Sequence, residues 1–244
     1  MEKLNRDEIY LICMKLDCES ILRLLSTNKK LYKMNLKDMW INKLDRFPNH
    51  KMKNYILLCQ LEKFKEKFKF KKNIYEIYDS DKISLADIRM INPPKILNNL
   101  INLYHLDLSG NRLTEIPIIF NLLNLEILNL NFNLIRTIPK ELFLLNNLEE
   151  LYLNNNEIVD IPEEIKNLNK LKTLLLQWNN IENLKPLSKL NNLETLWINH
   201  NPVITFPVEL ISLKKLTIAF SRQQYNKLSD DDRIYLKKKG YRIN

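Results

Sequence analysis

The stretch Leu103-Tyr104-His105-Leu106-Asp107-Leu108-Ser109-Gly110-Asn111-Arg112-Leu113, followed by Ile116-Pro117, decides how this chain folds. The same order of leucines, asparagine and a closing apolar residue returns from Leu125, Leu148, Leu171 and Leu193, so the copies begin every 22 or 23 residues. Five copies in register cannot be explained by composition alone. Self-similarity at this period predicts a stack of structural repeats.

The pattern Leu-x-x-Leu-x-Leu-x-x-Asn-x-Leu resembles the leucine-rich repeat. That resemblance implies an α/β fold, a leucine-rich-repeat solenoid whose x-Leu-x-Leu-x segments form a parallel sheet along its concave face. Neighbouring repeats would bury each other's leucines. The asparagine in the bend after each strand can bond backbone groups of the adjacent repeat that otherwise lack partners. We therefore assign a structural role to Asn111, Asn133, Asn156, Asn179 and Asn201.

The repeats extend beyond the five clear copies. Residues 92–103 align with residues 137–148, and this register places Ile83 and Leu85 at the inward positions of a degenerate first repeat. Terminal repeats are expected to be atypical because they cover an end of the core. We place the solenoid at residues 80–216 and a C-terminal cap at 217–244. Within the cap, Ser229 precedes a predicted helix with Ile234, Tyr235 and Leu236 facing inward.

The outward residues of the strands differ from repeat to repeat. They are small and polar in the first repeats and become aromatic in the later ones. Exposed aromatic clusters are typical of protein-binding hot spots. We therefore predict a target-binding patch on the concave face that consists of Tyr152, Leu175, Trp178, Trp197, His200 and Phe220. The alternative is that the tail from Arg222 to Asn244 covers part of this patch and includes Phe220 in the cap.

The first part of the chain is organised differently. Between Leu4 and Leu44 apolar residues recur at helical spacing, which predicts a small all-helical module at residues 1–50. So short a bundle buries too little apolar surface to be stable alone. Residues 51–79 form a helical connector, in which Tyr55 to Phe70 carries apolar residues on one side and lysines on the other.

The N-terminal module resembles the F-box over residues 3–45. The matching segments are Leu4-Asn5-Arg6-Asp7, Leu16-Asp17, residues 18–24 (CESILRL) and Met39-Trp40-Ile41-Asn42-Lys43-Leu44, with Asn5 in the place of the usual proline. F-box modules bind Skp1, the adaptor of a cullin-based ubiquitin ligase. By resemblance, the candidate residues for binding a Skp1-like adaptor are Leu4, Asn5, Ile9, Ile12, Leu16, Ile21, Leu22 and Leu24.

The formal net charge of +9 is unevenly distributed, with +7 in residues 1–80, −2 in 81–215 and +4 in 216–244. The repeats thus do not favour nucleic acid as a partner, although the lysines from Lys63 to Lys72 offer an alternative nucleic-acid surface. All three cysteines lie in the first quarter, and no signal peptide or membrane-spanning stretch is recognisable. We expect an intracellular protein, cytoplasmic or nuclear, that is not secreted.

The sequence contains no recognisable catalytic constellation. Two glycines cannot supply a phosphate-binding loop, and His105 and His200 lie too far apart in the array to share a metal. We expect no enzymatic activity, no cofactor, no metal and no small-molecule substrate. The leading hypothesis is a substrate-recognition subunit of a Skp1-cullin-F-box ubiquitin ligase that binds its protein target on the concave face. The alternative is an interaction scaffold or regulator without ligase coupling.

Overall fold

The computed structural model of the chain describes residues 60–61, 63–72, 74–203, 210, 216–219 and 221–238. The chain divides into two compact units, Met1–Ile77 and Tyr78–Asn244. The predicted helical module at residues 1–50 and all eight F-box-like residues lie outside the described residues, so their roles stay predictions.

The described part of the first unit is helical at residues 60–61 and 63–68. Phe64 is buried, and its ring centroid lies 5.0 Å from that of Phe68 and 5.1 Å from that of Phe70. The amino group of Lys67 lies 5.3 Å from the centre of the Phe68 ring, so this side chain extends over apolar surface. Helix α6 (Ile74–Tyr78) follows, with Ile77 buried.

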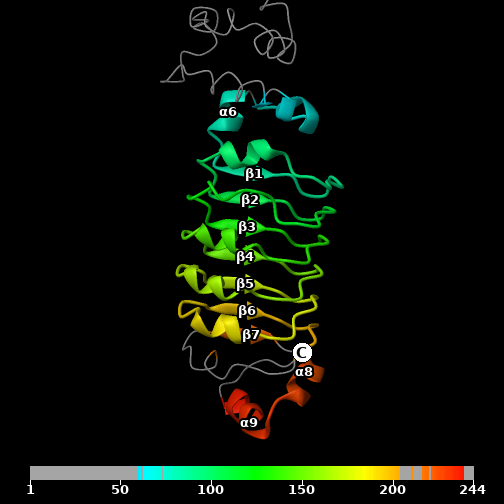
Figure 1. Cartoon of the computed structure of the whole chain (residues 1–244), viewed down its shortest axis with the longest axis vertical. Helices are drawn as coiled ribbons and strands as arrows, with labels where there is room; N and C mark the ends of the chain where they lie inside the picture. The colour runs from blue at the N-terminus through cyan, green and yellow to red at the C-terminus, as the bar shows by residue number, and fades with distance from the viewer. Residues whose placement is uncertain are drawn as a thin grey trace, which may run out of the picture. The chain divides into compact units, whose positions relative to one another are not determined.

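The second unit is built on one seven-stranded parallel sheet in which the strands are paired in chain order. Figure 1 shows the strands stacked one above the next, from β1 to β7. Short 3-10 helices return the chain between several of them: η1 (Lys95–Asn99), η2 (Lys140–Leu144), η3 (Glu163–Asn167) and η4 (Lys185–Lys189). The strands are β1 (Lys82–Ser84), β2 (His105–Asp107), β3 (Ile127–Asn129), β4 (Glu150–Tyr152), β5 (Thr173–Leu175), β6 (Thr195–Trp197) and β7 (Thr217–Ala219).

The register confirms the predicted inward leucines. Leu106 of β2 pairs with Leu128 of β3, and the central leucines of β4, β5 and β6 continue this row from strand to strand. All of these leucines are fully buried. Ile83 pairs with Leu106 and is buried with Leu85, which confirms the degenerate first repeat. Burial of one such side chain contributes about 1.5–3 kcal/mol, and only a neighbouring repeat can supply that burial.

The buried asparagines form the predicted ladder between repeats. The side-chain oxygen of Asn156 accepts a hydrogen bond from the Ile135 N–H at 3.0 Å. Its side-chain nitrogen donates to the backbone carbonyl oxygens of Leu130 at 3.0 Å and Leu153 at 3.1 Å. Two of these bonds reach the preceding repeat, and one stays in its own. The same arrangement recurs at Asn111, Asn133, Asn179 and Asn201. Each amide therefore satisfies backbone groups in the core that water cannot reach.

Proline sets how the chain enters most of the 3-10 helices. Pro94, Pro139 and Pro162 precede η1, η2 and η3 in the extended region, with φ between −62° and −68°. Leu184 takes this place before η4 with φ −102° and ψ 1°, and Pro186 lies inside the first turn. The missing proline changes the entry to the helix, but η4 still has the same length as the others.

The final repeat departs from the predicted register. Trp197 pairs with Ala219, and the inward residue opposite Leu196 is Ile218, which is 22 residues later and 1% exposed. Ala219 therefore takes the place beside Trp197 at which the predicted target-binding patch has Phe220. The side chain of Phe220 itself lies outside the described residues.

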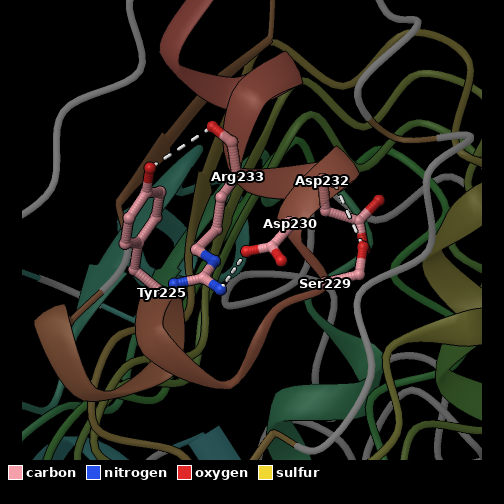
Figure 2. A network of polar contacts seen from close by, with 5 residues as sticks. All are labelled: Tyr225, Ser229, Asp230, Asp232 and Arg233. Atoms are coloured by element: carbon pink, nitrogen blue, oxygen red, sulfur yellow. Dashed lines mark hydrogen bonds and ion pairs between the residues drawn. The ribbon is translucent and has the colours of Figure 1, made fainter.

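Helices α8 (Arg222–Lys227) and α9 (Asp230–Lys238) follow β7. As Figure 2 shows, the Ser229 hydroxyl donates to Asp232 at 2.6 Å and accepts the Asp232 N–H at 3.2 Å, which caps α9 at the predicted start. Arg233 pairs with Asp230, and the Tyr225 hydroxyl donates to the Arg233 carbonyl oxygen at 3.3 Å.

Only part of the predicted inward face of α9 is correct. Leu236 is 1% exposed, whereas Ile234 is 53% exposed. Residues two apart on a helix lie about 200° apart around its axis, so both cannot face the same neighbour. The side chain of Tyr235 lies outside the described residues.

We predict that Asn156→Ala lowers the free energy of unfolding by at least about 2 kcal/mol, because each buried peptide group left unpaired costs about 1–3 kcal/mol. Urea denaturation measures the change. The control is Asn192→Ala, which removes one solvent-exposed inter-repeat bond, from the Asn192 amide to the Asn169 carbonyl oxygen. Equal losses in the two variants would show that the buried ladder has no special part in stability.

Candidate protein-interaction surface on the outer face of the sheet

We call the side of the sheet opposite the buried leucines the outer sheet face; it is the face predicted as concave. Three predicted site residues lie in one row on it, since Tyr152 on β4 pairs with Leu175 on β5, which pairs with Trp197 on β6. Tyr152 and Leu175 are half-buried, and Trp197 is 41% exposed. The structure thus brings these three residues together.

A second row follows three residues later along each repeat, in the bend after the strand. Trp178 and His200 belong to it, and their rings stack at 3.6 Å between centroids and 11° between planes. Both residues have φ 58°. Every described member of this row has φ between 55° and 65°: Asp87, Gly110, Phe132, Asn155, Trp178 and His200.

The positive φ in this row is an intrinsic property of the bend. Glycine and asparagine adopt it readily, and Gly110 and Asn155 occupy it in two repeats. At Gly110 the neighbouring Asp87 carboxylate also fills the space of a Cβ atom, since a Cβ built there would lie 1.9 Å from that oxygen. Aromatic residues at this φ are uncommon and cost of order 1–3 kcal/mol. Trp178 is nevertheless 53% exposed, so burial does not offset this cost.

Phe132 shares these properties and is absent from the predicted patch. It lies in the bend row with φ 55° and is 59% exposed. The sequence could have indicated Phe132, because it holds the same position of the repeat as Trp178, two repeats earlier. We therefore define the aromatic patch as Phe132, Tyr152, Leu175, Trp178, Trp197 and His200.

Between the two rows lies a polar row that includes Asn131, Asn154, Gln177 and Asn199. Asn154 is buried, and its side-chain oxygen has no hydrogen-bond partner among the described residues; the same holds for the side-chain oxygen of Gln177 in the next repeat. A buried acceptor without a partner costs about 1–3 kcal/mol. The middle of the outer sheet face is therefore not optimised for stability.

Tyr152 also interacts with a carboxylate on its own strand. Its hydroxyl donates to Glu150. Burial, followed by this hydrogen bond and the Glu150 charge, raises the pKa of Tyr152 to about 12. The phenol donates this hydrogen bond as a neutral group, and the bond holds the Glu150 side chain beside the patch.

Acidic side chains occupy the edge at which the strands begin. Lys172 pairs with Glu149 of the preceding repeat at 2.6 Å. The Glu149 hydrogen bond and charge raise the pKa of Lys172, and the charges of Glu194 and Glu126 add to this. Three carboxylates, those of Glu126, Glu149 and Glu194, therefore act on Lys172 at this edge.

The described residues contain no group of three or more His, Cys, Asp or Glu side chains that could hold a metal ion. Nor does any helix in the described ranges have the length and hydropathy needed to cross a membrane. What these residues offer is an exposed aromatic surface with polar and acidic surroundings, whose chemistry is that of recognition.

Comparison with known proteins identifies the repeats. Residues 102–123 match the family model described as Leucine Rich Repeat, and residues 123–181 match a second model, described as Leucine rich repeat. The repeats within residues 102–181 are therefore recognised as leucine-rich repeats. No curated protein matches the chain.

Solved structures show the same architecture. A leucine-rich-repeat protein of Leptospira interrogans is 25% identical over 67% of this chain, with a TM-score of 0.56, and an internalin from Listeria monocytogenes is 25% identical over 66%, with a TM-score of 0.50. This chain spans 54% of each of those proteins. The PEPR1–AtPEP1 structure is 27% identical over 58% of this chain and 21% of its own, with a TM-score of 0.51. A seven-stranded parallel sheet with these neighbours fits a leucine-rich-repeat solenoid.

We predict that Phe132→Asn raises the free energy of unfolding by about 1 kcal/mol, because asparagine tolerates the left-handed backbone at this position. The reciprocal variant Asn155→Phe, at φ 56° in the next repeat, should lower it by a similar amount. Thermal and urea denaturation of the pair measure both changes. If Phe132→Asn destabilises the protein instead, the phenyl ring contributes more through packing than the backbone strain costs.

We also predict that Tyr152 stays un-ionised at pH 11, where an ordinary tyrosine is largely phenolate. Its contribution to stability is present below pH 10 and is lost as the pH rises towards 12, because the unfolded state releases the proton first. NMR of the tyrosine ring carbons, assigned with Tyr152→Phe, follows the titration. Glu150→Gln should lower the pKa without fully restoring the ordinary value, since burial is the larger cause; an unchanged pKa would exclude the Glu150 contribution.

Proposed function

We propose that this protein is an interaction adaptor that binds a target protein on its outer sheet face. The observation that carries the proposal is the exposed aromatic row held at positive φ, above all Trp178 stacked on His200. Strained and solvent-exposed aromatic side chains reduce stability, and residues of this kind cluster at binding sites. Aromatic residues also supply a large share of the binding free energy at protein interfaces.

The solenoid architecture supports this role. Stacked repeats present a long surface whose outward residues vary without affecting the buried leucines and asparagines. Trp178 and Trp197 come from adjacent repeats, so a partner that contacts both lies across the strands. The proposal gives the chain no catalytic step, no cofactor and no metal.

We further propose that the adaptor is the substrate-recognition subunit of a Skp1-cullin-F-box ubiquitin ligase inside the cell. What supports this part is the sequence resemblance over residues 3–45, which assigns Leu4, Ile9 and Ile12, among others, to a Skp1-like partner. The target would then be presented for ubiquitylation on the outer sheet face. The alternative is a leucine-rich-repeat scaffold or regulator that binds the same target without ligase coupling.

The recognition surface is tested with Trp178→Asn plus Trp197→Ala, in which asparagine suits the positive φ at residue 178. We expect the double variant to lose target proteins that the unmodified protein captures from cell extract, as read by mass spectrometry, while its circular dichroism and unfolding midpoint are retained. The matched control is Leu123→Ala plus Leu144→Ala, which removes two side chains that are 57% and 55% exposed in the return segments. If the tryptophan variant still captures the targets and the leucine control does not, the recognition surface lies on the return segments.

The ligase coupling is tested separately by gel filtration of the full-length protein with purified Skp1 at micromolar concentration. We expect a stable complex, and Ile9→Asp plus Ile12→Asp should abolish it because charged residues cannot enter an apolar interface without a partner. A protein that binds no Skp1 but still captures its target through Trp178 and Trp197 would support the scaffold alternative.

A further inference from the structure

The segments that form the outer sheet face and its edges are acidic in a basic chain. The strand-and-bend segments of the four repeats that carry the aromatic patch are residues 126–136, 149–159, 172–182 and 194–203. They contain six glutamates and two basic residues, a formal net charge of −4, whereas the whole chain is +9. The acidic residues are Glu126, Glu149, Glu150, Glu157, Glu182 and Glu194.

Both basic residues are already paired within the surface. Lys172 pairs with Glu149 at 2.6 Å, and Arg136 pairs with Glu157 at 2.8 Å, so each ion pair joins adjacent repeats. These two cations neutralise Glu149 and Glu157, and they leave the carboxylates of Glu126, Glu150 and Glu182 without an ion pair to either of them. Glu150 is held beside the aromatic patch by the Tyr152 hydroxyl, and Glu126 is exposed immediately before β3.

The aromatic residues favour the same kind of partner. The faces of indole rings attract cations, arginine guanidinium groups more often than ammonium groups. Trp178 and Trp197 are about half exposed, at 53% and 41%. Leu175 lies between Tyr152 and Trp197 in the strand row and supplies apolar surface for the aliphatic part of a long basic side chain.

We propose that the occupant of the outer sheet face is an extended, positively charged segment of a partner protein. Its arginine or lysine side chains lie over Trp178 and Trp197 and reach Glu126 and Glu150, while its apolar side chains contact Leu175. This inference rests on the proposed function, since it specifies the chemistry of the target. A nucleic acid is disfavoured at this face because the carboxylates repel its phosphates.

The test selects a display library of random short peptides against the full-length protein. The peptide with the tightest binding is then synthesised, and its Kd is measured by fluorescence at low and at higher salt. The variants are Glu126→Gln plus Glu150→Gln, the control Glu163→Gln plus Glu164→Gln on η3, and the Trp178 and Trp197 double variant. All four glutamate substitutions remove a charge at little change in volume, and only the first pair includes a residue, Glu150, that contacts the aromatic patch.

We expect the selected peptides to carry a net positive charge and to bind more weakly as salt screens the exposed carboxylates. Affinity should fall about three- to tenfold in the Glu126 and Glu150 variant and stay unchanged in the η3 control. If the selected peptides are neutral or acidic and their binding still requires Trp178 and Trp197, the inference of a basic partner is overturned and the proposed function stands. Peptides that bind regardless of the tryptophans would contradict both, and a library without binders would exclude a linear segment as the occupant.

Discussion

The hydrogen bonds of the buried asparagines are the constraint on which the rest of this structure depends. Each amide connects two repeats, as Asn179 does by accepting the Ile158 N–H at 2.9 Å and donating to the Leu153 carbonyl oxygen at 2.9 Å. The chain must therefore make the same bend after every strand, because the amide can satisfy these groups only in that geometry. The repeat length follows from this requirement together with the burial of the leucines.

The bend determines what the outer sheet face can present. It places one residue per repeat at positive φ, whichever side chain that residue carries. Gly110 and Asn155 meet the requirement without strain, whereas Phe132 and Trp178 do not and remain exposed. Stability would favour asparagine or glycine at each of these positions. The recognition role that we propose gives these aromatic residues a reason to occupy strained positions, and the acidic residues of the same segments are the basis for the proposed basic partner.

The repeats were predictable because their signals are local and redundant. Inward leucines, bend asparagines and the degenerate first repeat follow from spacing, and the structure agrees at Ile83 and Leu85. The predicted register fails after Trp197, because the segment after β7 has no asparagine to mark the bend, and Ala219 rather than Phe220 pairs with Trp197. The stacking of Trp178 on His200 depends on a positive φ that tryptophan rarely adopts. In the sequence, Asp87, Gly110 and Asn155 at the same position of other repeats pointed to this backbone angle. The F-box-like segment remains a prediction from sequence.

Hydrogen exchange measures whether the asparagines hold the repeats together, because it reports on the backbone N–H groups whose hydrogen bonds their side-chain oxygens accept. These are the backbone N–H groups of Met90, Leu113, Ile135, Ile158 and Ile181. They lie outside the strands, and we predict that they exchange as slowly as the strand amides and only through opening of the stacked repeats. In Asn156→Ala the Ile135 amide should lose protection selectively. Rapid exchange at all five positions in the unmodified protein would contradict the account, since the asparagines would then not hold the repeats together.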